Sequence, residues 1–553
     1  MFFYYNHKGV NDMEKRSLWS SRFTFILAAI GSAVGLGNAW RFPGLAAKHG
    51  GGTFLVVYLL AMVIMGIPLL MMEISISRKF RKGAIESMRG IGKKFEPIGW
   101  AATSNAFVIV CYYAVVFAWV ILMFANSWQF AGMTGNSEKA SSLFFDLTMT
   151  TGAIDGTIVP GEVLLCLLVA WGLIFFCIRN GASSVGKVVK FTVFAPVVLL
   201  IIMAVKGCTM NGAADGLKIL FVPDMQAFGD PSLWVDAIGQ VFYSLSIMMA
   251  IMFAYGSYVG DDADVAMDAV IIAFSDMAIS VLSGIVMFST MGGTGMLDKV
   301  TDSGVATAFI VYPQAIVNLT DIGWLNAGFG AIFYLMLITL AIDSAFSIVE
   351  GVSTAIADKF HIKPKKVTIS VCAVCGFISL IFATQAGLAW LDIVDNWTNQ
   401  INLILIGVCE CLAVGWAFDL HKVHHEINRN TGKFKAPYWW VASSIKVISP
   451  LLLIGLFIWN MIDLFGNKGG SYGGYPIWAQ VLAGWIVSGL VFLSGFIAKI
   501  FINYRKKHKK NYAEDEVFWE NGITNPLDNI SAVYVKKPLS KTAAKKRKRN
   551  KKR

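Results

Sequence analysis

Long apolar runs separated by short polar segments make up most of the chain. Each run is long enough for a helix to cross a bilayer, which takes about 20 residues. The pattern therefore predicts an all-α polytopic membrane protein with 12 transmembrane helices, placed near residues 18–48, 52–78, 98–131, 160–178, 186–206, 233–258, 265–292, 327–358, 366–385, 389–418, 436–464 and 476–504.

The loops between these runs differ in positive charge. Segments 78–95 and 421–435 hold seven and four lysines and arginines, whereas segment 134–159 holds only Lys139. Cytoplasmic loops carry the excess of positive charge in membrane proteins. Because an even number of spans returns the chain to its starting side, both termini are predicted to be cytoplasmic.

The composition supports this class and excludes a soluble enzyme, since 56% of the residues are apolar, 15% are charged and the mean hydropathy is +0.61. Nearly all of the net charge of +12 comes from residues 505–553, where 16 lysines and arginines stand against five acidic residues. We expect a solvated cytoplasmic tail there, with contact to anionic lipid or RNA as the alternative. The predicted domains are a cytoplasmic segment at 1–15, a transmembrane domain at 16–504 and the basic tail at 505–553.

The eight cysteines do not form a disulfide pattern, because seven lie inside apolar runs and Cys208 lies near the end of a run. Cys372 and Cys375 have the spacing of zinc ligands, but no second ligand pair is nearby, so packing explains them better. The polar start of the chain lacks the apolar core of a signal peptide.

The first run contains the stretch GSAVGLGNAWRFPG, Gly31 to Gly44, with four glycines and a proline. We expect this helix to break, and broken backbone is tolerated at membrane depth only where it lines a protein-enclosed, solvated cavity. Its free carbonyl groups suit a small cation, and the half-helix that begins near Asn38 points its positive end at a carboxylate. A structural helix kinked by Pro43 is the alternative.

The sixth run is interrupted by polar residues, Tyr243 to Ser246. Paired interruptions at matching places in two halves of a chain point to the binding site of a transporter. We therefore predict a 5+5 inverted repeat, about 18–206 and 233–418, with broken helices 1 and 6, followed by the helices of 436–504.

Acidic residues inside the predicted spans each need a hydrogen-bonding partner or a bound cation. The acids singled out in this way are Glu73, Asp276, Asp343, Asp395 and Glu410, with Glu350 nearer the inner half of its span. Asp343 stands beside Ser344, and this carboxylate and hydroxyl predict an alkali-cation site. Glu73 has no hydroxyl or amide neighbour in the sequence, so we expect it to accept a hydrogen bond from the backbone.

Eight ordered stretches resemble the neurotransmitter:sodium symporter family, whose bacterial members carry amino acids on the leucine-transporter fold. They cover about Arg16 to Asn503 and include GSAVGLGNAWRFP, KHGGGTFLVVYLL, GQVFYSLS, DSAFSIVEG and LDIVDNW.

The resemblance implies two sodium sites, a substrate site and two gates. The first sodium site would use Ala33, Asn38, Ser244 and Asp276, and the second would use Gly31, Val34, Leu340, Asp343 and Ser344. The substrate would contact Ser32, Ala33, Gly37, Ile109, Tyr113, Tyr243, Ser244, Ser246, Met249, Ser344 and Ile348. The outer gate would be Arg41 with Asp395, and the inner gate Arg16 with Asp358, near Trp19 and Tyr258.

The resemblance predicts a sodium-coupled secondary active symporter that imports a neutral, hydrophobic amino acid by alternating access. Gly35 stands where amine-carrying relatives have an aspartate. Chloride is not expected to be required, because Asp276 supplies a fixed carboxylate near Tyr58, Gln240 and Ser280, where chloride-dependent relatives have an asparagine. A sodium-gated channel, or a transceptor that binds an amino acid without concentrating it, is the alternative.

Segment 134–159 is short and lacks the cysteine pair of animal relatives, which favours a bacterial inner membrane. The expected partners are the small-molecule amino acid and membrane lipid, with no nucleic acid.

Overall fold

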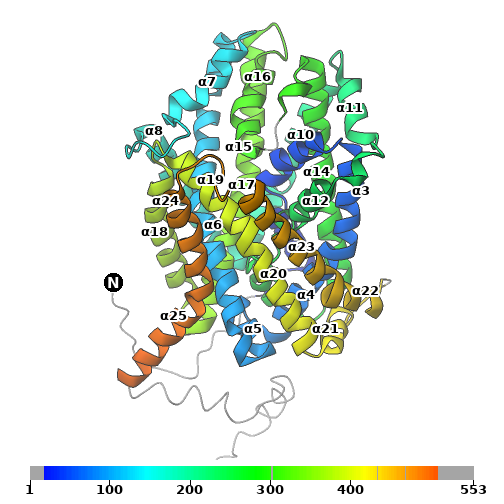
Figure 1. Cartoon of the computed structure of the whole chain (residues 1–553), viewed down its shortest axis with the longest axis vertical. Helices are drawn as coiled ribbons and strands as arrows, with labels where there is room; N and C mark the ends of the chain where they lie inside the picture. Colours follow the sequence, from blue (N-terminus) through cyan, green and yellow to red (C-terminus); the bar gives the residue numbers. More distant parts are fainter. Residues whose placement is uncertain (1–17, 301–302, 433, 468, 509–553) are drawn as a thin grey trace, which may run out of the picture. The chain divides into compact units, whose positions relative to one another are not determined.

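The computed structural model describes residues 18–300, 303–432, 434–467 and 469–508. The chain divides into two compact units, 1–495 and 496–553, and the first contains all the described residues of the candidate site. Within the described ranges the chain folds into helices joined by loops, without a strand (Figure 1).

The predicted spans become helices, several of which contain a π-helical turn. In chain order the helices that form these spans are α1 (Arg22–Ala33), α2 (Phe42–Lys48), α3 (Gly52–Ala61), α4 (Ile67–Phe80), α6 (Glu96–Ala125), α8 (Gly161–Ile178), α9 (Ala182–Thr192), α10 (Phe194–Cys208), α12 (Pro231–Ser244), α13 (Ile251–Ser257), α14 (Val265–Thr294), α17 (Gly323–Phe360), α18 (Pro364–Phe382), α19 (Gly387–Trp397), α20 (Ile404–Leu412), α22 (Tyr438–Ser443), α23 (Ser449–Ile462), α24 (Ile477–Ala479) and α25 (Val487–His508).

Shorter helices connect these spans. They are α5 (Ala84–Ile91), α7 (Ser137–Thr148), α11 (Ala213–Phe221), α15 (Gly304–Ala306), α16 (Tyr312–Ile316) and α21 (Leu420–Ile427). The π-helical turns that matter for the site are η1 (Gly37–Arg41), η8 (Thr398–Leu403), η10 (Ser444–Ile448) and η11 (Asp463–Asn467).

The first apolar run is broken where the sequence predicts it. α1 ends at Ala33, and a second helical segment, Gly37–Lys48, follows at an angle of 53°. Val34 is extended, with φ −79° and ψ 102°. Gly37 allows a close approach, because a Cβ added to it would lie 2.6 Å from the Tyr243 ring. The break therefore leaves backbone groups outside any helix at the centre of the unit.

The sixth apolar run is also broken, but the break extends further than predicted. α12 continues through Ser244, and residues 245–250 are irregular before α13 begins. Ser246, Met248 and Ala250 adopt left-handed backbone conformations, with φ of 53°, 64° and 61°. The polar residues mark the start of the break, but its length could not be predicted because left-handed backbone is usually signalled by glycine.

Ten helices in the described part of the chain are long and apolar enough to cross a membrane, or up to eleven if the bent pair Arg22–Ala33 and Gly37–Lys48 forms one span. The further span predicted near 233–258 is divided between α12 and α13, which are both short. The structure thus supports a polytopic helical membrane protein. The count of twelve and the inverted repeat stay predictions.

Neighbouring helices surround both unwound segments. α1 packs against α9, α14 and α17, while α13 packs against α4 and α17 and is buried along its whole length. α17 runs beside α6 through the unit (Figure 1). Protein on all sides is the condition under which non-helical backbone can exist at membrane depth.

Candidate functional site

The two unwound segments are joined by hydroxyl groups. Ser246 Oγ donates to the backbone carbonyl of Ser32 at 2.8 Å, and Ser344 Oγ lies 3.5 Å from the same oxygen. Ser32 Oγ also donates to Ser347 Oγ on α17 at 3.0 Å. α1, the irregular segment after α12 and the middle of α17 therefore meet at one buried polar centre.

Three of the four residues predicted for the first sodium site are in direct contact. Asn38 Nδ2 donates to Ser244 Oγ at 2.9 Å and to Asp276 Oδ1 at 2.7 Å, and Ser244 Oγ donates to Asp276 Oδ2 at 2.5 Å. All three side chains are buried. Ala33, which would contribute its carbonyl, is the last residue of α1. The cluster offers the carboxylate, hydroxyl and amide oxygens that hard cations bind.

Two further hydroxyl groups complete the surroundings of Asp276. Tyr58 OH donates to Asp276 Oδ2 at 3.2 Å, and Ser280 Oγ, one helical turn along α14, accepts from Asn38 Nδ2 at 2.8 Å. Gln240 Nε2 donates to the backbone carbonyl of Gly37 at 3.4 Å. Tyr58, Ser244 and Ser280 thus belong to one hydrogen-bonded cluster with Asn38 and Asp276, whereas Gln240 contacts the backbone of Gly37.

The second predicted sodium site centres on Asp343. This side chain is 2% exposed, and its Oδ1 has no hydrogen-bond partner. The carboxylate lies against the backbone of α1, because a Cβ added to Gly31 would be 2.5 Å from Asp343 Oδ2. The remaining residues of this site, Val34, Leu340 and Ser344, are buried in the same part of the unit. An unpartnered buried carboxylate oxygen suits a bound cation.

Two of the predicted substrate residues, Tyr113 and Ser344, lie beside Gly35. A Cβ added to Gly35 would lie 2.5 Å from Ser344 Oγ and 3.7 Å from Tyr113 OH. The Tyr113 hydroxyl is buried and makes no hydrogen bond of ordinary geometry, although Ser344 and the Leu36 backbone are near it. The apolar members of the site, Ile109, Met249 and Ile348, are all buried.

In the predicted outer gate, the Asp395 carboxylate and the Arg41 guanidinium group are not in contact. Asp395 Oδ1 accepts from Tyr112 OH at 2.7 Å and from Asn399 Nδ2 at 2.8 Å. Arg41 instead stacks over the Tyr243 ring, 5.2 Å from its centre. The charges of Arg41 and Asp395 both act on Tyr243. Within the described residues, no ion pair between Arg41 and Asp395 is formed.

At the predicted inner gate, the Trp19 ring packs edge-on against the rings of Tyr255 and Tyr258. Trp19 Nε1 donates to the Tyr255 carbonyl and the Trp19 N–H donates to the Tyr258 carbonyl, both at 3.0 Å. Tyr258 OH donates to Glu350 Oε1 at 2.7 Å. Asp358 Oδ2 accepts from the Gly83 N–H at 2.7 Å. Arg16 lies outside the described residues, so its pairing with Asp358 stays a prediction.

Glu73 accepts a backbone hydrogen bond, which confirms its expected role. Its Oε1 accepts from the Met248 N–H at 2.6 Å, inside the irregular segment that follows α12. The sequence did not reveal which backbone group this would be, because Glu73 and Met248 are 175 positions apart.

An ion pair at the predicted outer end of the broken helices was also missed. His49 Nε2 lies 2.7 Å and Lys48 Nζ 3.1 Å from Asp236 Oδ2, which joins the end of α2 to α12. Asp230 caps α12, and the hydroxyl and N–H that Ser232 donates to it lower the pKa of that carboxyl. Charged side chains with partners far along the chain have no local sequence signal.

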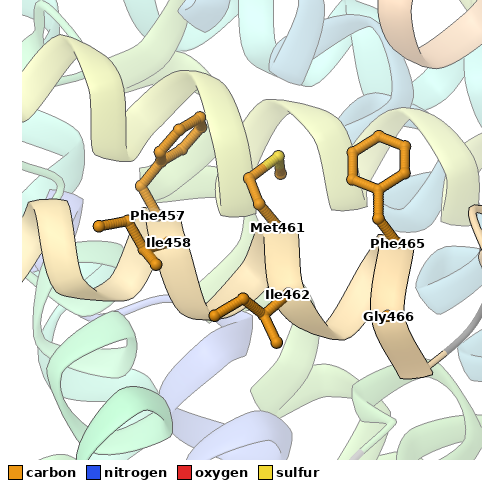
Figure 2. A pocket seen from close by; sticks show the side chains of 6 residues that line it. All are labelled: Phe457, Ile458, Met461, Ile462, Phe465 and Gly466. Carbon is orange, nitrogen blue, oxygen red and sulfur yellow. The ribbon is translucent and has the colours of Figure 1, made fainter.

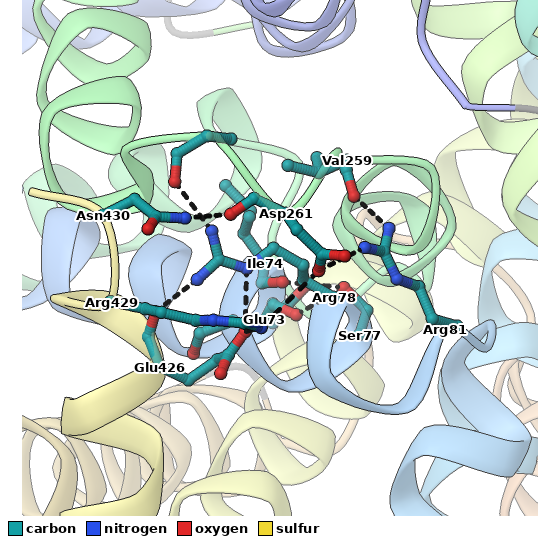
Figure 3. Close-up of polar contacts among 12 residues, drawn as sticks. Glu73, Ile74, Ser77, Arg78, Arg81, Val259, Asp261, Glu426, Arg429 and Asn430 are labelled. Carbon is teal, nitrogen blue, oxygen red and sulfur yellow. Dashed lines mark hydrogen bonds and ion pairs between the residues drawn. The ribbon is translucent and has the colours of Figure 1, made fainter. Parts of the chain in front are cut away.

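Arg78 is the centre of a buried polar cluster at the predicted cytoplasmic end, and the sequence analysis had counted it only as loop charge. Its Nε donates to Glu426 Oε1 at 2.9 Å, its Nη2 to the Glu426 carbonyl at 2.5 Å and its Nη1 to the Ala263 carbonyl at 2.8 Å (Figure 3). Asp261 extends the cluster, with Arg81 Nη2 at 2.7 Å and Arg429 Nη1 at 3.5 Å. These contacts connect α4, the segment after α13 and α21.

One cavity of the described part lies away from this site and another lies at its edge. An open apolar groove of about 550 Å³ is lined by one face of α23 and η11, from Phe457 to Gly466 (Figure 2). A space of about 20 Å³ lies between Arg41, Tyr243 and Asn399, on the outer side of the substrate residues. The small space borders the predicted outer gate.

Comparison with known proteins gives a consistent set of relatives. The model of the sodium:neurotransmitter symporter family matches residues 16–138 and 144–505. An uncharacterized sodium-dependent transporter of Methanocaldococcus jannaschii is 32% identical, over 88% of this chain and 97% of that protein. The sodium-dependent neutral amino acid transporter B(0)AT3 of Rattus norvegicus is 29% identical, over 91% and 96%. The human sodium- and chloride-dependent creatine transporter 1 is 30% identical, over 85% and 80%.

Proposed function

The chain belongs to the sodium:neurotransmitter symporter family, so it is a sodium-dependent transporter and not an enzyme, and we propose that it imports a neutral, hydrophobic amino acid by alternating access. Sodium enters with the amino acid and supplies the driving force. We further expect the protein in a bacterial inner membrane with both termini in the cytoplasm.

The observation that carries the substrate class is the Tyr113 hydroxyl. It is buried beside Gly35 without a hydrogen bond of ordinary geometry, and a buried unpaired donor is costly. A substrate carboxylate would satisfy it, together with backbone N–H groups at the start of the helical segment that begins at Gly37. Gly35 offers no carboxylate to an amine, so a substrate that brings its own carboxylate fits better.

The side-chain pocket favours apolar substrates. Ile109, Met249 and Ile348 provide the buried apolar surface and no charge. A substrate with a charged side chain would leave that charge unpaired in the protein interior, at a cost of several kcal/mol. Neutral hydrophobic amino acids are therefore the proposed class, and the neutral amino acid transporter among the relatives supports it.

Two sodium ions are proposed as co-substrates. Asn38, Ser244 and Asp276, with the Ala33 carbonyl, would hold the first beside the substrate carboxylate. Asp343 and Ser344, with carbonyls of Gly31, Val34 and Leu340, would hold the second between α1 and α17. Each ion would join the broken helix to a continuous one, so ion binding would favour the arrangement in which the substrate pocket is complete.

Chloride is not proposed as a co-substrate. The Asp276 carboxylate is a fixed negative charge that accepts hydrogen bonds from Tyr58, Ser244 and Asn38. That charge can balance the first sodium ion without a diffusible anion. The creatine transporters among the relatives are named as chloride-dependent, so this property would separate the present chain from them.

The test is uptake by the full-length protein in proteoliposomes under an inward sodium gradient. A panel of amino acids, creatine and biogenic amines competes with a labelled neutral amino acid. We expect a hydrophobic neutral amino acid to compete best and to accumulate above its external concentration. Best competition by an amine, arginine or glutamate would contradict the substrate class, and uptake that never exceeds the external concentration would indicate a channel or receptor.

A glycine variant tests the role of the unwound segment in the same assay. Gly35→Asp puts a carboxylate next to Tyr113 and Ser344 and should abolish amino acid uptake. Gly132→Asp is the matched control, because a Cβ at Gly132 meets no neighbour. Unchanged uptake by Gly35→Asp would show that the substrate carboxylate binds elsewhere.

A further inference from the structure

Two buried carboxyl groups lie outside the predicted sodium and substrate sites. Glu73 on α4 and Glu410 on α20 are both fully buried. Glu73 Oε2 and both oxygens of Glu410 have no hydrogen-bond partner. Met248 relates the two acids, because its N–H donates to Glu73 Oε1 and its side chain packs beside Gly407, about one helical turn before Glu410. The Glu73 carboxyl is also a charge that acts on Glu410. On this geometry we treat the two acids as a pair.

No cation balances this pair within the described residues. On the elements that pack against α4 and α20, Arg78 pairs with Glu426, Asp268 with Arg22 and Glu86 with Lys359, while Asp276 accepts from Asn38. Lys446 on η10 forms no ion pair with either acid, and its side-chain stem lies beside Gly415. Other titratable groups near the pair are Cys409 and Cys411 of α20, Tyr255 of α13, which lies in the field of Glu350, and His424 of α21, which contacts the Ala436 carbonyl.

Two ionised carboxylates cannot remain side by side in such surroundings. Each would lose its hydration without gaining a partner, and like charges would repel at low dielectric constant. A proton solves both problems, because it neutralises one acid and turns it into a donor toward the other. In such a pair the proton belongs to both groups.

We propose that Glu73 and Glu410 form a proton-binding site that holds the unwound segment of the sixth span. Glu73 stays ionised, because its Oε1 accepts the Met248 N–H, and Glu410 carries the proton. Met248 also packs toward α20, since a Cβ added to Gly407 would lie 3.5 Å from Met248 Cγ. The pair thus lies on two sides of a residue with left-handed backbone.

Proton loss would act directly on that segment. With both acids ionised, repulsion would separate α4 from α20, and the Met248 N–H bond to Glu73 would be strained. Sodium fits the site less well, because a hard cation takes several oxygen ligands, and one carboxylate oxygen here is already engaged while the neighbours of Glu410 are cysteines. The proposal does not depend on which substrate is carried.

Infrared spectroscopy of the full-length protein in lipid vesicles tests the site without a transport assay. At neutral pH we expect a protonated-carboxyl band that Glu410→Gln removes and the neighbouring exposed variant Cys409→Ser keeps. Glutamine resembles the protonated acid, so Glu410→Gln should fold. A spectrum unchanged in Glu410→Gln would overturn the proposal, as would a band that disappears on addition of sodium.

A second variant tests whether the acids act as a pair. Glu73→Gln removes the like charge, so the Glu410 band should be lost at lower pH than in the native protein. Hydrogen exchange in residues 245–250 should rise once the band is lost in the native protein, and should stay low in Glu410→Gln over the same pH range. An unshifted band, or equal exchange in both proteins, would contradict the proposal.

Discussion

At the residue scale, the carboxylate of Asp276 decides what its neighbours can bind. It accepts hydrogen bonds from Asn38, Ser244 and Tyr58, so these donors are already engaged with a negative group. A chloride ion at this place would lie within a few ångströms of the carboxylate, and the two negative charges would repel in a low-dielectric site. In the function proposed above, this one side chain takes the role that a diffusible anion would otherwise have.

Replacement of chloride by gluconate tests this role. The native protein should transport equally well in both salts. Asp276→Asn should lose most uptake in gluconate and recover part of it in chloride, because the neutral amide leaves the sodium charge unbalanced. Ser280→Ala is the matched control, since it removes a neighbouring hydroxyl but keeps the carboxylate. Native uptake that collapses in gluconate would disprove the assignment.

Individual side chains were predictable from the sequence where a motif or a membrane-embedded charge marked them. Asn38, Ser244 and Asp276 are in contact as expected, and Glu73 accepts a backbone N–H as expected. Arg78 and His49 could not be assigned in this way, because their partners Glu426 and Asp236 lie on distant segments. A charged residue near a span end looks the same in sequence whether it faces solvent or a buried acid.

At the scale of elements, the predicted outer gate involves four of them. Asp395 on α19 accepts from Tyr112 on α6, while Arg41 at the end of η1 lies over Tyr243 on α12. Arg41 and Tyr243 line the small space at the edge of the substrate residues, together with Asn399, which donates to Asp395. Closure would bring them together, directly or through water.

Asp395→Asn should therefore weaken occlusion without affecting sodium binding. Bound substrate should dissociate faster, by about tenfold if closure loses about 1.4 kcal/mol, and net uptake should slow. Tyr112→Phe serves as the control, because it removes the hydrogen bond but keeps the charge that Arg41 would meet. Normal substrate retention in Asp395→Asn would exclude the gate, and a loss of sodium binding would show that Asp395 belongs to an ion site.

Element boundaries were predictable to the extent that composition marks them. Glycines and the proline placed the first break correctly, at 34–36. The second break was placed at Tyr243–Ser246, but α12 continues to Ser244 and the irregular segment extends to Ala250. Met248 and Ala250 resemble helix residues in sequence, and only the tertiary contacts, such as that with Glu73, favour their left-handed conformation.

At the scale of the molecule, the cluster around Arg78 joins segments from three parts of the chain. Its guanidinium group is fully buried and donates to Glu426 and to the Ala263 carbonyl. A guanidinium group without hydration needs all of these acceptors. The cluster therefore fixes the predicted cytoplasmic ends of α4 and α21 to the segment that follows α13.

Arg78→Met should destabilise the protein strongly, because it leaves Glu426 buried beside only the partly exposed Arg429. We expect a loss of about 3–5 kcal/mol, the usual effect of removing one partner of a buried pair, measured by thermal unfolding in detergent. The double variant Arg78→Met, Glu426→Met should recover a large part of this loss. If the single and double variants unfold alike, the two side chains are not energetically coupled.

The class of the whole molecule was the most predictable property, since apolar length alone indicates a polytopic membrane protein. Apolar length does not predict how the helices are arranged, because almost all of them are apolar around much of their surface. What selects their neighbours is the fit of small and polar residues, such as Gly31 against Asp343. Such a fit involves residues from distant parts of the chain.

The left-handed backbone at Ser246, Met248 and Ala250 should make this segment stiff, and its stiffness should affect which ligands the pocket accepts. A side chain in left-handed backbone has few alternative conformations nearby, whereas glycine passes easily between them. The wall that carries Met249 is therefore rigid, and a rigid wall accepts a narrow range of ligand sizes. Ala250→Gly should broaden that range toward larger aromatic side chains in competition assays. It should also leave thermal stability nearly unchanged, while Ala254→Gly, a buried helical control, should cost about 1 kcal/mol.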